Sequence, residues 1–142
     1  MTISASLGQH AAEGTASFRC AACCEIAAVV RAIPAGGRFD MGPPMGLQSQ
    51  DRDGIVVDYF GGTVWKRAEA PVFQAVREIL GGESPDPAAL RQIDWELASF
   101  YCTACGQNYC RSHWHAIVLF DECSYDCTMG RCPSGHRQMI DD

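Results

Sequence analysis

The sequence has no long apolar run. Nowhere in its 142 residues do about 20 consecutive apolar side chains occur, the length needed to cross a bilayer. Residues Met1 to Ser17 lack the basic start and apolar stretch of a secretory signal peptide. The chain has no run of lysines and arginines, and its formal net charge is −6, which disfavours nucleic acid and anionic membranes as partners. We therefore expect a cytoplasmic protein that acts away from membranes.

The motifs of catalytic zinc sites are also missing. The sequence contains neither H-E-x-x-H nor the H-x-E with P-C-x-x-C signature of zinc deaminases. A zinc enzyme would need an open coordination position and a nearby carboxylate as general base. A zinc enzyme is therefore a less favoured alternative.

Cysteine, by contrast, is abundant. The chain has nine cysteines, and an odd number in a reducing compartment favours metal ligands over disulfides. Zinc prefers four tetrahedral sulfur and nitrogen ligands, and a C-x-x-C turn places two sulfurs on one ion. Four pairs have suitable spacing: Cys20/Cys23, Cys102/Cys105, Cys110/His113 and Cys132/His136. Gly106, directly after the second pair, can adopt the left-handed conformation that such a turn needs.

These pairs can be wired sequentially or alternately. Sequential wiring would force two pairs onto one ion across a loop of only four residues, from Gly106 to Tyr109. Alternation avoids that crowding and predicts two zinc ions. The first would be held by Cys20, Cys23, Cys110 and His113, and the second by Cys102, Cys105, Cys132 and His136. Both sets are closed structural sites, and binding two ions through six thiolates would bring the net charge to about −8.

Several other side chains could compete for metal. Cys24, Cys123 and Cys127 are expected to be buried free thiols, although the last two could replace one assigned pair. His115 is an alternative to His113, and His10 is expected to be solvated. Redox chemistry at the Cys20-Ala-Ala-Cys23 turn remains a further alternative, and it would require a metal-free turn.

The rest of the chain predicts one domain over residues 18–142, after a flexible tail over residues 1–17. The pattern F-x-C-x-A-C occurs twice, at Phe18–Cys23 and at Phe100–Cys105, and residues 24–101 between the two copies are predicted to form an α/β insertion. The predicted elements of the insertion are a strand at 26–33, a surface loop at 41–46, a hairpin of 55–60 with 63–65, a helix at 71–80 and a second helix after Pro87. The first helix has an apolar face of Val72, Phe73, Val76, Ile79 and Leu80, and the second has Leu90, Ile93, Leu97 and Phe100.

The stretch from Cys102 to His113 resembles the central knuckle of the cross-brace zinc domains, which include RING and FYVE fingers. Cys132-Pro-x-x-His136-Arg137 resembles the final knuckle of a RING finger. The resemblance covers residues 18–24 and 100–137, and it implies a small α+β, treble-clef zinc domain with an inserted strand, hairpin and two helices. The spacing departs from the RING pattern, because RING fingers keep the first two pairs closer and separate the last two ligands by two residues.

This resemblance implies a protein-interaction module, either a RING-like ligase for a ubiquitin-type protein or an adaptor. Such a ligase recruits a conjugating enzyme and has no catalytic residues of its own. Arg137 matches the basic residue that helps a RING finger hold its conjugating enzyme against the cargo. Only Ala21 and Ala22 stand where a RING finger presents an apolar contact, and the basic lipid-binding motif of FYVE fingers is absent. The alternatives are a zinc-stabilised adaptor without ligase activity and, less favoured, an enzyme or a nucleic-acid-binding protein.

Overall fold

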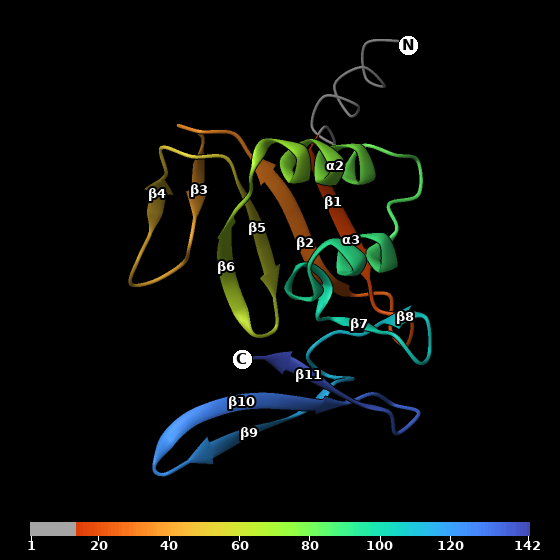
Figure 1. Ribbon diagram of the computed structural model, residues 1–142. Helices are drawn as coiled ribbons and strands as arrows, with labels where there is room; N and C mark the ends of the chain where they lie inside the picture. Colours follow the sequence, from red (N-terminus) through yellow and green to blue (C-terminus); the bar gives the residue numbers. More distant parts are fainter. Residues whose placement is uncertain (1–13) are drawn as a thin grey trace.

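The computed structural model describes residues 14–142, so most of the expected tail lies outside the described residues. The largest sheet is antiparallel with the order β1-β2-β5-β6, and helices pack across it (Figure 1). Its elements are β1 (Thr15–Arg19), β2 (Ile26–Ile33), β5 (Gly54–Tyr59), β6 (Gly62–Arg67), α2 (Ala70–Leu80), α3 (Pro87–Ile93) and the 3-10 helix η1 (Trp95–Ala98). Strand β1 includes residues 15–17, which the sequence had placed in the tail.

Three smaller sheets complete the described chain. Strands β3 (Arg38–Asp40) and β4 (Leu47–Ser49) form one pair, and β7 (Tyr101–Cys102) and β8 (Gln107–Asn108) form another. The C-terminal sheet contains β9 (His115–Asp121), β10 (Ser124–Arg131) and β11 (Arg137–Asp141) in the order β11-β10-β9. Figure 1 shows this C-terminal sheet beneath the large sheet, with β7 and β8 between them. None of the helices in residues 14–142 has the length and hydrophobicity needed to span a bilayer.

Strand β2 has the predicted bounds. Strands β5 and β6 form the predicted hairpin, but Tyr59 pairs with Gly62, so the turn residues are Phe60 and Gly61, one position earlier than the predicted turn at 61–62. The loop at 41–46 joins β3 to β4, with left-handed glycines at both Gly42 and Gly46. Because glycine has no Cβ, it adopts this conformation without steric cost.

The two α-helices begin and end at residues that the sequence explains only in part. Helix α2 starts with Pro71 in its first turn and buries Phe73, Val76 and Leu80, whereas Val72 from the predicted apolar face is exposed. The predicted second helix does not run on to Phe100. It ends at Ile93 because Asp94 is extended, and the Asp94 carboxylate then accepts a hydrogen bond from the Glu96 N–H to begin η1.

A second core lies between the large sheet and the C-terminal sheet. It consists of Cys20, Ala27, Cys102, Tyr109, Cys110, Trp114, Cys132 and Ile140. The buried Trp114 indole donates a hydrogen bond to the Phe100 carbonyl at 2.9 Å. From β11, the Gln138 amide donates to the carbonyls of Ser99 and Tyr101 at 3.1 and 2.6 Å. These bonds fix the C-terminal sheet to the chain that leaves η1.

The predicted fold class is wrong. The described chain is mostly β, with eleven strands against two α-helices and one 3-10 helix, and it does not form the predicted α+β zinc finger with an insertion. Residues 24–101 supply three of the four strands of the largest sheet and both α-helices, so they build the main body of the fold. The spacing of ligand pairs indicates which pairs meet, but it says nothing about the size of the structure between them.

Candidate metal centres

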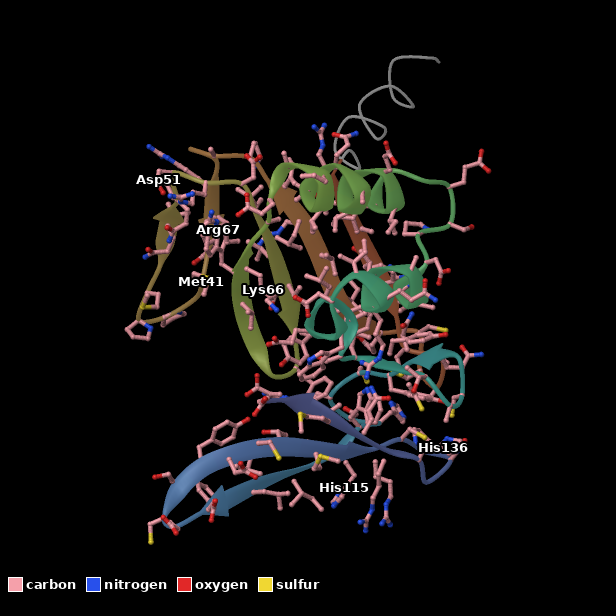
Figure 2. The ribbon with its side chains drawn as sticks, in the orientation of Figure 1. Met41, Asp51, Lys66, Arg67, His115 and His136 are labelled. Atoms are coloured by element: carbon pink, nitrogen blue, oxygen red, sulfur yellow. The ribbon has the colours of Figure 1, made fainter. Side chains whose placement is uncertain are left out.

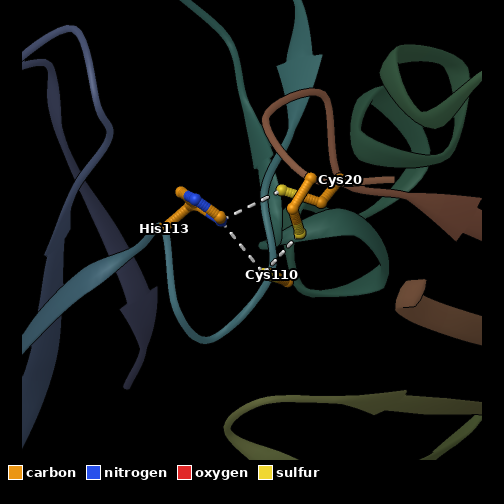
Figure 3. Close-up of side chains that lie close together, drawn as sticks. Cys20, Cys110 and His113 are labelled. Carbon is orange, nitrogen blue, oxygen red and sulfur yellow. Dashed lines mark hydrogen bonds between the residues drawn. The ribbon is translucent and has the colours of Figure 1, made fainter. Parts of the chain in front are cut away.

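The structure brings the eight paired side chains together in two clusters. In the first cluster, Cys20, Cys23, Cys110 and His113 have all their ligand atoms within 4.8 Å of one another. The His113 Nδ1 lies 3.5 Å from the Cys20 Sγ and 3.3 Å from the Cys110 Sγ (Figure 3). The Sγ atoms of Cys23 and Cys110 are 3.6 Å apart. Residues nearly 90 positions apart in the chain therefore meet at one point.

The second cluster has the same composition and contains Cys102, Cys105, Cys132 and His136, again within 4.8 Å of one another. The His136 Nδ1 lies 3.2 Å from the Cys105 Sγ, 3.3 Å from the Cys132 Sγ and 3.9 Å from the Cys102 Sγ. The grouping is alternate along the chain, because the first and third pairs form one cluster and the second and fourth form the other.

The two C-x-x-C turns have the same backbone hydrogen bond and end in the same left-handed conformation. In the second turn, the Gly106 N–H donates to the Cys102 carbonyl at 2.8 Å, and Gly106 has the predicted left-handed conformation with φ of 69°. In the first turn, Cys24 does the same, with a bond of 2.9 Å to the Cys20 carbonyl and φ of 65°. The repeated phenylalanines before these turns, Phe18 and Phe100, are in contact, with ring centroids 5.2 Å apart. The sequence repeat thus corresponds to a repeated structure.

The two cysteine–histidine pairs are held by different turns. The N–H groups of His113 and Trp114 both donate to the Cys110 carbonyl, so this pair lies in a tight turn that leads into β9. Cys132 and His136 instead close the connection between β10 and β11, where the Cys132 N–H donates to the His136 carbonyl at 2.9 Å. Gly135, with φ of 91°, supplies the backbone conformation of that longer turn. This turn accounts for the three residues between the last two ligands.

The donor atoms fit a tetrahedral zinc ion. Bonds of about 2.3 Å to sulfur and 2.0–2.1 Å to nitrogen imply S···S distances of about 3.7 Å and S···N distances of about 3.5 Å in a tetrahedron. The sulfur pairs Cys23–Cys110 and Cys105–Cys132 are both 3.6 Å apart. Each cluster can therefore hold a metal ion, and its four protein ligands would leave no position for a substrate.

The pKa values of the cysteine thiols differ within each cluster. A hydrogen bond from the Tyr109 hydroxyl lowers the pKa of the Cys105 thiol to about 6, whereas burial raises the pKa of the Cys102 thiol to about 11. Burial would also raise the pKa of Cys20, but hydrogen bonds from backbone groups such as the Cys110 N–H lower it to about 6. Each cluster thus stabilises one thiolate before a cation arrives, and a cation would stabilise the others.

The remaining candidates lie outside both clusters. Cys127 is buried, as predicted, but Cys24 and Cys123 are exposed, and both have positive φ because they occupy tight turns. His115 is exposed at the start of β9 (Figure 2). Among the described residues none of these joins a cluster, and His10 lies outside the described part of the chain. Arg137 is exposed at the first position of β11.

The sequence reasoning missed an exposed apolar surface on the C-terminal sheet. Its large exposed apolar side chains are Ile117, Val118, Leu119, Phe120, Tyr125 and Met139. The signal was the apolar and partly β-branched run over residues 116–120, which is typical of a strand. On one face of this sheet lies a hollow of about 250 Å³, lined by His115, Ile117, Leu119, Met129, Gly130, Arg131 and Arg137.

Comparison with curated proteins and with solved structures finds no match. A comparison with protein-family models finds one whose match extends from residue 10 to residue 142 and so includes both clusters and all four sheets. That family is described as a domain of unknown function, DUF8328, and the chain belongs to it.

Proposed function

We propose that this protein is a zinc-stabilised protein-interaction module, in which two structural zinc ions fix the C-terminal sheet as a binding surface. The observation that carries the proposal is the placement of the second cluster. Its ligands Cys132 and His136 close the β10–β11 connection, while Cys102 ends β7 and Cys105 lies in the turn between β7 and β8. A zinc ion there would bind the sheet to the rest of the molecule. A reducing cytoplasm, where thiols stay available to metal, suits this function.

The exposed apolar residues support protein binding. Exposed apolar side chains on a soluble domain can mark interaction sites, and six of the ten large exposed apolar side chains among the described residues lie on this sheet, with Ile117 and Leu119 on the face that carries the hollow. The hollow on its face combines apolar Ile117, Leu119 and Met129 with the guanidinium groups of Arg131 and Arg137. Such a surface suits a polypeptide segment with both apolar and acidic side chains.

Zinc content is the first test. Elemental analysis of protein purified under reducing conditions should find two zinc ions per chain, because the described residues form two complete ligand sets. Removing the metal should unfold the segments around both clusters, since structural zinc contributes roughly 10–16 kcal/mol of apparent binding energy in small finger peptides. A metal-free protein that keeps the same melting temperature would contradict a structural role.

Selection of displayed random peptides on the zinc-loaded protein tests the binding surface. Enriched peptides should be apolar and acidic, and a synthetic copy should lose most of its affinity for the variants Arg131→Glu and Arg137→Glu. The control is Arg38→Glu, which changes another exposed arginine, on β3 and outside the hollow. Failure to enrich any peptide, or equal binding by all three variants, would refute this surface.

A RING-like ligase is a second candidate, and one observation favours it. Arg137 directly follows the ligand His136 and is exposed, so metal would fix its backbone while its planar fork of donors could reach two partners. The exposed Ala21 and Ala22 of the first turn offer little apolar contact, which makes this candidate the weaker one. Arg137→Ala should keep both metals and slow discharge of a cognate conjugating-enzyme thioester several-fold. Unchanged discharge would exclude the ligase role of Arg137.

A further inference from the structure

Strand β9 leaves one backbone edge unpaired. It is the last strand in the order β11-β10-β9, and no other strand in residues 14–142 pairs with its outer edge. All seven of its residues, from His115 to Asp121, are exposed. Natural proteins usually protect such an edge with proline, lysine or a bulge in the edge strand. Here the sequence His-Ala-Ile-Val-Leu-Phe-Asp contains neither residue, and the register shift between β9 and β10 lies in β10, between Tyr125 and Cys127.

The hairpin between β9 and β10 determines which backbone groups point outward. Asp121 and Ser124 close a two-residue turn in which Glu122 and Cys123 have φ of 48° and 68°. The closing pair of such a turn exchanges its hydrogen bonds within the hairpin. Because alternation along β9 is uninterrupted, the N–H and C=O groups of Ala116, Val118 and Phe120 point away from β10. These groups form a regular ladder with no partner in the described chain.

We propose that the partner of this edge is β9 of a second copy of the chain, paired antiparallel about a two-fold axis through Val118. Pairings centred on a residue bring outward groups opposite one another, whereas pairings centred between two residues do not, and among the former the centre at Val118 overlaps all seven residues of the strand. Val118 then faces its own copy, and Ala116 faces Phe120 of the second copy, in pairs that exchange hydrogen bonds. Two three-stranded sheets would become one continuous sheet of six strands. This proposal goes beyond the peptide-binding face, with which the edge pairing shares the side chains of His115, Ile117 and Leu119.

The ends of the strand are complementary in this register. His115 lies opposite Asp121 of the second copy, where an imidazole N–H can donate to the carboxylate, and Ile117 lies opposite Leu119. These are pairs without backbone hydrogen bonds, in which side chains approach most closely. Strand β10 adds a charge at each end of β9, positive beside His115 and negative near Asp121. Arg131 pairs with His115 at one end, and Asp126 lies in β10 near the turn at the acidic end. Parallel pairing would place like ends together, so the charges select the antiparallel arrangement.

Measurement of molar mass tests the dimer directly. Light scattering on eluting zinc-loaded protein should show a concentration-dependent dimer. Val118→Lys should give a monomer, because two ammonium groups would face each other across the two-fold axis. The matched control is Leu47→Lys, at another exposed apolar strand position, which is 68% exposed and lies in β4. A wild-type chain that stays monomeric up to about 1 mM would overturn the proposal.

A charge exchange tests the register. The single variants Asp121→Arg and His115→Asp should both dimerise weakly. At both ends of its own interface, the first variant places the new arginine opposite His115, and the second places the new aspartate opposite Asp121. Mixed together, they should form a heterodimer in which both end pairs are attractive, detectable by native mass spectrometry. Homodimers of undiminished strength, or no heterodimer on mixing, would refute this register. Hydrogen exchange gives a second measurement. The amides of Ala116, Val118 and Phe120 should be protected in the dimer and should exchange freely in the Val118→Lys variant.

Discussion

Gly130 lies in β10 against two side chains of the second core, Ile140 and Trp114. A Cβ added there would lie 2.7 Å from the Cγ1 and 2.9 Å from the Cδ1 of Ile140, and 2.9 Å from the Cε3 of Trp114. Both neighbours are almost fully buried, with exposures of 2% and 3%, so they have little space into which to move. The variant Gly130→Ala therefore tests whether packing or backbone entropy determines the residue at this position.

The two effects predict opposite signs. Backbone entropy alone favours alanine over glycine within a strand by roughly 0.5–1 kcal/mol. Overpacking a close-packed core by one methyl group costs about 1–3 kcal/mol. Since the three contacts at Gly130 are all shorter than 3.0 Å, we expect overpacking to prevail and the free energy of unfolding to fall by about 1–2 kcal/mol. Urea unfolding of the zinc-loaded protein, followed by tryptophan fluorescence, measures this difference.

A second substitution identifies the cause. Ile140→Val removes the Cδ1 methyl group and should by itself cost about 0.5–1.5 kcal/mol. In the double variant this loss should relieve part of the overlap, so that the total is smaller than the sum of the single effects by about 1 kcal/mol. The zinc content should stay at two in all three variants, because neither residue is a ligand. A stabilising Gly130→Ala, or strictly additive effects, would refute the packing argument.

Three other predictions follow from the metal turns and from the two ion pairs of Lys66. Replacing Cys20 and Cys110 together by serine should remove one zinc ion, whereas replacing Cys20 and Cys102 should remove both. Elemental analysis of the two double variants therefore distinguishes alternate from sequential wiring. Cys24→Gly should raise the free energy of unfolding by about 1 kcal/mol, because it relieves a left-handed backbone, and an unchanged or lower midpoint in urea would argue against strain there. Burial lowers the pKa of Lys66, but its two carboxylate partners outweigh this and leave the pKa raised, so its stabilisation should be complete below the ordinary lysine pKa and decline above it. The difference in stability between wild type and Lys66→Met should therefore shrink as the pH rises past the folded-state pKa, and a constant difference would exclude the ionic contribution.

Local patterns in the sequence were sufficient to predict several elements and the grouping of the paired side chains. The β-branched run at 26–33, the Gly61-Gly62 pair and Pro71 each act on their own neighbours, so the strand, hairpin and helix could be located without knowing the fold. The alternate grouping followed from one short loop, which could not hold two pairs on one ion without crowding.

The architecture could not be predicted because it depends on contacts between distant segments. Asp94 ends a helix whose apolar spacing continues past it, since its carboxylate binds the Lys66 ammonium and caps the next turn. Cys24 occupies in the first C-x-x-C turn the position that Gly106 occupies in the second. Its side chain is exposed because the backbone there is left-handed, a conformation that cysteine rarely adopts. The run at 116–120 looks like a core strand, although the fold leaves it at a sheet edge.

The unequal chain separations within the two clusters bear on the order in which the molecule folds. The second cluster closes a short loop, with 27 positions between Cys105 and Cys132, whereas the first joins Cys23 to Cys110 across 87 positions. For a flexible chain, the longer closure costs about 1 kcal/mol more in entropy. The C-terminal cluster should therefore capture metal first and organise residues 102–136 as an early folding unit. The first cluster would then bind its ion later in folding and join the segment after β1 to residues 102–136, which are already folded.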